Sequence, residues 1–209
     1  KQADFAALGW IPKSIEGKFS GSVDLALQGN TIDEMIGDLY IEQGKLQTPD
    51  KTYFFSSLAA QSRLTNNIRV LNISSEDVAT GLIIGEFKPT ELHKLIKNAL
   101  GTQFSNYAAE EITSNQYVDF NFNLRGKIAS ALFGEDVILD DNTFVNGKIR
   151  PYDELFKLNV RAPKIQINNT TLEKLEIQVD TDNPLYHSFV SLNTLESPRG
   201  NLRHLNWIN

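Results

Sequence analysis

Side chains able to do chemistry are few and widely spaced in this chain of 209 residues. It has three histidines, His93, His187 and His204, and no second ligand follows any of them at the two- or four-residue spacing of a metal pair. It has no cysteine, which excludes thiol nucleophiles, disulfides and Cys-ligated metal sites within it. We therefore expect surface or capping histidines, no metal site and no cofactor.

An acidic cluster is the other group that a cation could use. Asp136, Asp140, Asp141 and Asn142 lie close together, but without the spacing of an EF-hand loop. A solvated turn is the favoured interpretation. The nucleophile elbow, the phosphate-binding loop and the dinucleotide fingerprint are also missing from the sequence. An enzyme is thus the least favoured class of protein.

Composition excludes further classes. The net charge is −6, whereas a nucleic-acid binder needs a basic surface. The same charge gives no support for electrostatic docking on anionic lipid headgroups. No stretch approaches eighteen apolar residues, and the first residues are too polar for a signal peptide. We expect neither a membrane-spanning helix nor a leader in this sequence.

The remaining elements are amphipathic strands. Apolar and polar residues alternate from Phe19 to Leu27, which is the period of a strand with one apolar and one wet face. Gly29 breaks this strand, and residues 31–36 predict one turn of helix that Gly37 closes. A second alternating strand follows, so the unit is strand, helical turn, strand.

Parts of this unit recur twice along the chain. In the second copy Gly126 stands where Gly29 stands, and residues 129–134 match the helical turn. In the third copy Leu172 and Leu175 match the apolar pair of that turn. Repeats of one supersecondary unit are typical of an array, with chance similarity among amphipathic strands as the competing explanation.

The rest of the chain predicts more strands and one helix. Residues 89–100 form a single apolar stripe, so this helix either caps the sheet or lies on a membrane surface. A bulge or a twist is expected near Val70, and a hairpin turn is expected at Asn146-Gly147. The polar residues 101–116 predict a loop and a boundary between two halves, and the tail predicts one further strand.

Three segments together resemble a TamB-type protein of the AsmA-like superfamily, which comprises large envelope proteins of double-membraned bacteria. These segments are GSVDLALQGNTIDEMIGDLYIEQGKL, LNISSEDVATGLIIGEFKPTEL and NNTTLEKLEIQV. The resemblance implies a mainly β fold: an elongated, curved, U-shaped antiparallel sheet with an apolar inner groove and a few short helices. Residues 1–209 would then form one segment of a periplasmic β-groove array, with the parent chain anchored in the inner membrane. It also implies phospholipid transport between the two membranes, or assembly of outer-membrane proteins.

The candidate site is the apolar face of the strands. Its expected lining residues are Phe19, Val23, Leu25, Leu27, Tyr53, Phe55, Phe120, Phe122, Leu124, Ile165 and Ile167. Such a face is either the inner layer of a closed sandwich or an open trough for phospholipid acyl chains, and alternation is the same in both. The main hypothesis is a non-enzymatic phospholipid conduit. The alternative is an assembly module whose open strands pair with an outer-membrane barrel protein.

Overall fold

The computed structural model describes residues 2–3, 18–47, 52–101, 108–113, 115–126 and 137–209. The strands are β1 Gln2–Ala3, β2 Lys18–Gln28, β3 Ile36–Gln47, β4 Thr52–Thr65, β5 Ile68–Ser74, β6 Ala79–Glu86, β7 Tyr117–Leu124, β8 Val137–Leu139, β9 Thr143–Arg150, β10 Leu155–Ile167, β11 Thr170–Asp180, β12 Ser188–Ser197 and β13 Gly200–Ile208. The helix α1 spans Leu92–Gly101, and two short 3-10 turns are η1 Pro89–Glu91 and η2 Pro151–Asp153. The fold is therefore mainly β.

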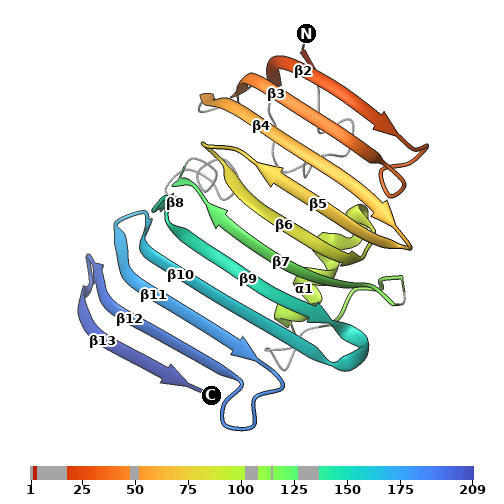
Figure 1. Ribbon diagram of the computed structural model, residues 1–209. Coiled ribbons are helices and arrows are strands. Elements are labelled where there is room, and N and C mark those ends of the chain that lie inside the picture. Colours follow the sequence, from red (N-terminus) through yellow and green to blue (C-terminus); the bar gives the residue numbers. More distant parts are fainter. Residues whose placement is uncertain (1, 4–17, 48–51, 102–107, 114, 127–136) are drawn as a thin grey trace.

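The strands form one open antiparallel sheet (Figure 1). Each strand pairs with its neighbours in the sequence, except that β7 pairs with β9 and β8 lies off this path against β10. Short connections between consecutive strands favour this order. The described part of the chain contains no second sheet, and its two edges are β1 and β13. The closed two-sheet sandwich is thus not the arrangement of these strands.

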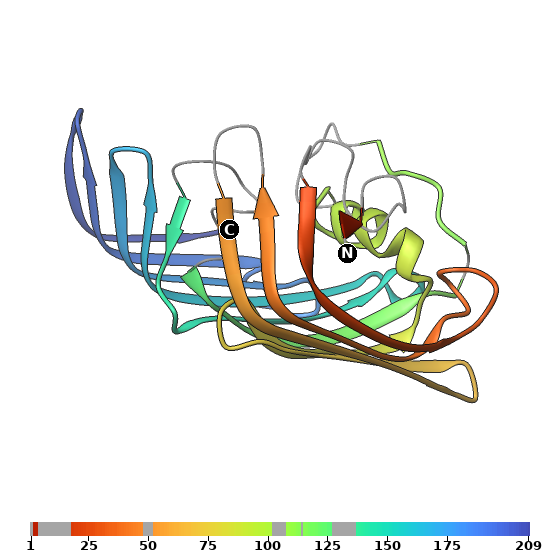
Figure 2. The ribbon, with the colours of Figure 1, turned by 90° about the horizontal axis from the view of Figure 1, so that it is seen from above.

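The long strands bend along their length, and α1 lies on the concave side (Figure 2). Left-handed backbone interrupts three of them, at Gln43, Lys174 and His204, with φ of 51°, 52° and 54°. Lys174 lies between the registered pairs that flank Pro163, a residue without an N–H to donate to the ladder. Left-handed residues and unpaired positions bend a strand and increase its twist. They give a local cause for the curvature.

The helix α1 is anchored to the sheet by its central apolar residues. Leu95 is fully buried, and Ala99 is 7% exposed. Both belong to a core cluster with Ile83 and Val118 of the central strands. The predicted stripe is present, but its flank at Ile96 is 38% exposed. Because the centre of the stripe packs on the sheet, the capping interpretation fits this helix better than the membrane-surface one.

The first predicted unit is present. The amide of Met35 donates to the Thr31 carbonyl at 3.0 Å, which closes one helical turn between β2 and β3. Gly37, however, lies inside β3 and does not end the turn. It faces Leu27 at φ 132°, and a Cβ there would collide with the Ala26 carbonyl oxygen. This glycine lets two strands approach closely.

The third predicted copy of the unit is wrong. Leu172 and Leu175 lie in β11, and β10 joins β11 through the two residues Asn168 and Asn169 without a helical turn. Asn168 has φ 52°, a conformation that asparagine tolerates. In the second copy, residues 129–134 lie outside the described residues.

Two further expectations are corrected by the strand register. No bulge lies near Val70, because β5 keeps a continuous register with both neighbours. The strand itself alternates regularly. The pattern in the sequence looks shifted because a charged residue, Arg69, occupies an inward position. The tail forms two strands, β12 and β13, because Pro198 and Arg199 make a tight turn between them.

The expected hairpin at Asn146-Gly147 is also wrong. Both residues lie within the continuous strand β9, and Gly147 pairs with Phe120 on one side and Leu158 on the other. A Cβ on Gly147 would lie 2.5 Å from the Lys157 carbonyl oxygen and 2.6 Å from Phe120 Cζ. The glycine makes room for a neighbouring ring, and the Asn-Gly pair is not a turn here.

Gly147→Ala is expected to destabilise the protein by about 1–3 kcal/mol, because the added methyl group overpacks this site. Urea unfolding measures the change. Gly21→Ala is the control and should cost less. A Cβ on Gly21 would lie no closer than 3.2 Å to any atom other than those of Gly21 and its two chain neighbours. Equal losses in the two variants would contradict this account.

The stability of the segment beside α1 is expected to fall in acid. Thr113 donates its amide N–H to the Glu91 carboxylate at 2.8 Å, and this hydrogen bond lowers the pKa of Glu91 below its ordinary value of 4.5. Gln116 donates to the same carboxylate. A lowered folded-state pKa stabilises the fold above pH 4.5, and the contribution is lost as the pH falls through the lower value. Hydrogen exchange at Thr113, compared between pH 6 and pH 3, should show the loss. In Glu91→Gln the same comparison should change less.

Candidate apolar binding face

The strand register divides the sheet into an apolar and a polar face. Directly opposed residues of antiparallel neighbours share a face. One row on the α1 side crosses eleven strands without a polar side chain, and we call it the apolar row. Its members are Leu25, Leu39, Ala60, Ile73, Gly81, Phe122, Val145, Val160, Ile177, Val190 and Trp207.

Members of the apolar row keep accessible surface. None of them is fully buried, and Leu25 and Trp207 at its two ends are each 50% exposed. The rows under α1 are less exposed: Val118 is 0% exposed and Ile149 is 2% exposed. In the described part of the chain, α1 therefore covers one part of this face and leaves the apolar row accessible.

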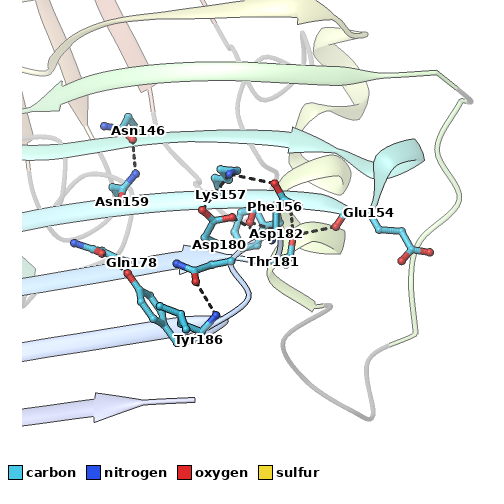
Figure 3. A network of polar contacts seen from close by, with 12 residues as sticks. Asn146, Glu154, Phe156, Lys157, Asn159, Gln178, Asp180, Thr181, Asp182 and Tyr186 are labelled. Carbon is cyan, nitrogen blue, oxygen red and sulfur yellow. Dashed lines mark hydrogen bonds and ion pairs between the residues drawn. The ribbon is translucent and has the colours of Figure 1, made fainter.

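The opposite face is mainly polar in the central strands, although Leu82 and Ile84 of β6 also lie on it. The row beside the apolar row contains Asn121, Asn146, Asn159 and Gln178 in adjacent strands. Asn159 Nδ2 donates to Asn146 Oδ1 at 2.9 Å, and the Tyr186 hydroxyl donates to Gln178 Oε1 at 3.3 Å (Figure 3). Amides that bond to one another across strands can also face water, which suits an outer surface.

Charged pairs reinforce the outer face. Lys157 Nζ lies 3.0 Å from Asp180 Oδ2, and Thr181, directly after β11, accepts from the Phe156 amide near the start of β10 at 2.9 Å (Figure 3). Such partly exposed pairs contribute little to stability. They distinguish the two faces of the sheet.

Six of the predicted lining residues fall in three adjoining rows on the α1 side. Leu25 and Phe122 are members of the apolar row. Leu27 and Phe120 belong to the next row on one side, and Val23 and Leu124 lie on the other. The structure thus places on one face, in strands β2 and β7, residues that are about 100 positions apart in the sequence.

The other predicted lining residues lie elsewhere. Tyr53 and Phe55 pair with Leu46 and Gly44, past the interruption at Gln43. The side chain of Phe19 lies outside the described part of the structure.

Ile165 and Ile167 lie in the last part of β10, beyond Pro163. Ile165 pairs with Leu139 on one side and Leu172 on the other, in a separate apolar row. The register does not join this row to the apolar row, because the alternation is interrupted between them.

A hollow of about 390 Å³ opens beside the turn Thr31–Met35. Leu39, Ala60 and Ile73 of the apolar row line it together with Arg69 and residues of the turn and η1. Most of its lining is apolar. This is the one place on the face where a buried charged side chain borders the apolar surface among the described residues.

Arg69 is only 2% exposed. It donates from Nη1 to the Met35 carbonyl and to Ser62 Oγ, both at 2.6 Å, and from Nη2 to the Asp33 carbonyl. Burial lowers the pKa of the guanidinium, and the charge of Asp33 opposes this shift. Sequence reasoning missed this residue. The available signal is an arginine within the alternating segment IRVLNIS. The shift in alternation that it causes predicts a bulge instead of a buried charge.

The described residues contain no group of three side chains able to hold a metal ion. Within the same residues, no helix is both long and apolar enough to span a membrane. No family model, curated protein or solved structure matches the chain.

Proposed function

We propose that the chain is a non-enzymatic segment of a TamB-type, AsmA-like envelope protein. In this proposal its concave face is an apolar groove that holds phospholipid acyl chains, and the parent protein, anchored in the inner membrane, conducts lipid across the periplasm to the outer membrane. The observation that carries the proposal is the apolar row, which is unbroken over eleven strands and keeps accessible surface.

The energetics favour an acyl chain as the occupant. Each methylene removed from water contributes about 0.8 kcal/mol, so a chain lying along several strands offsets much of the cost of leaving a bilayer. Large accessible apolar surfaces usually mark an interaction site. The polar side chains of the opposite face allow that side of the sheet to remain in water.

The direct test is lipid extraction and native mass spectrometry of the purified chain. We expect bound phospholipid, and we expect a photoreactive residue at position 160, in the apolar row, to crosslink to it. A photoreactive residue at Asn159, on the outer face, is the matched control. A lipid-free chain with no crosslink at either position contradicts the proposal.

A second candidate is the assembly module, and the edge strand β13 favours it. All nine residues of β13 are exposed, and it pairs only with β12. An exposed edge strand is a template for strand addition by a partner, such as an outer-membrane barrel protein.

Pull-down from envelope extract tests this candidate. Proline is placed at Leu205 and at Asn206 in turn, because consecutive N–H groups point to opposite edges of a strand. The substitution that removes the donor on the free edge should abolish capture while β12 pairing persists. Full capture by both variants contradicts strand addition.

A further inference from the structure

We propose that the hollow beside the turn Thr31–Met35 binds the anionic head of an acyl-chain amphiphile, with Arg69 as the cation that recognises it. The inference rests on the proposed function, because it assigns the head-group end of the same apolar face. It adds a selectivity for anionic over neutral amphiphiles.

The charge of Arg69 is incompletely matched. Arginine is seldom buried unless it is paired. No carboxylate of the described residues forms an ion pair with it; Asp33, whose charge raises the pKa of Arg69, accepts instead from the amide of Thr90 at 3.0 Å and from Thr90 Oγ1 at 2.8 and 2.9 Å. A cation is thus left in an apolar wall without an acidic partner in contact.

Arg69 also has donors to spare. A guanidinium has five N–H groups, and the hydrogen bonds to Met35, Ser62 and Asp33 occupy three. Nε is buried and has no partner. Carboxylate and phosphate oxygens are the acceptors that best suit a guanidinium edge. Because Nε has almost no accessible surface, the anion reaches it only when side chains lining the hollow shift.

The apolar surroundings indicate what the anion is attached to. Leu39, Ala60 and Ile73 line the hollow and also belong to the apolar row. A chain whose head meets Arg69 can therefore continue along the sheet. A free inorganic anion would leave this apolar surface in water, and a neutral amphiphile would leave the charge unmatched.

The test is calorimetric titration at pH 8 with two matched pairs of probes below their micelle concentrations. One pair is dodecanoate and dodecanol; the other is short-chain phosphatidylglycerol and phosphatidylcholine of equal chain length. We expect the anionic member of at least one pair to bind ten times more tightly or better. The pair that shows the preference tells whether a fatty-acid carboxylate or a phospholipid phosphate is the head.

Arg69→Met is expected to abolish the preference. Arg63→Met is the control, because Arg63 lies on the outer face with 54% of its side chain exposed. Circular dichroism checks folding; if Arg69→Met does not fold, Arg69→Lys keeps the charge, loses the planar edge and should reduce the preference.

Two results overturn the inference: equal binding within both pairs by the wild type, or a preference that survives Arg69→Met. If the neutral probes still bind, only the anion site is wrong. If no probe binds, the proposed acyl-chain function is wrong as well.

Discussion

Phe122→Asp is expected to weaken acyl-chain binding about 100-fold while much of the fold remains. Phe122 lies in the middle of the apolar row, between Gly81 and Val145, and is only partly buried. A charged side chain in a hydrocarbon environment costs about 3 kcal/mol, which corresponds to about 100-fold in affinity. On an accessible face, water can hydrate the carboxylate when no lipid is bound, so the folding cost is smaller than in a dry core.

Thermal melting and lipid crosslinking on the same variant decide the outcome. Asn121→Asp is the matched control, because it places the same new charge on the adjacent residue of the outer face. We expect normal loading for this control. A folded Phe122→Asp with normal lipid loading would show that this face is not the path, and an unfolded one would show that the site is a closed core.

Leu95→Ala is expected to destabilise the protein by about 2–5 kcal/mol. Leu95 is the fully buried contact between α1 and the sheet, within the cluster that includes Val118 and Ile149. Truncation of Leu95 removes these contacts and leaves a cavity between α1 and the sheet. Since a domain has a total stability of about 5–15 kcal/mol, the loss is a large share of it.

Denaturant unfolding with a helix signal and a sheet signal measures this change. Ile96→Ala, one residue along the helix and 38% exposed, is the control and should cost less than about 1.5 kcal/mol. Similar losses in the two variants would mean that the packing of α1 does not depend on Leu95.

The sequence predicted strands well where one face is uniformly apolar. The alternation in β2 and β7 gave the correct elements and placed Leu25 and Phe122 on the same face. Alternation with a period of two can be recognised in the sequence because each of these strands has one apolar face and one face in contact with water. The helix was equally clear, because its apolar stripe and its flanking Pro89 and Gly101 agree.

The predictions failed at positions whose conformation depends on contacts with residues far away in the sequence. Asn146-Gly147 has the local chemistry of a turn, yet the ring of Phe120 and the backbone of β10 need the space that Gly147 leaves. Arg69 broke the alternation because it bonds to a turn more than 30 residues earlier in the chain. Neither partner is visible in a window of neighbouring residues, so the hollow could not be predicted from the sequence.

The order of strands in space, which nearly follows their order in the chain, has a mechanical consequence. Each inner strand is held mainly by its two neighbours, and in the described residues the edge strands β1 and β13 are held by one. A pulling force on the C-terminus acts on the β12–β13 pair as on a zipper, opening its hydrogen bonds one after another. Next, β12 becomes the edge strand that bears the load, held by β11. Force would thus shorten the sheet in steps of about one strand, and relaxation would allow it to regrow from the part that remains.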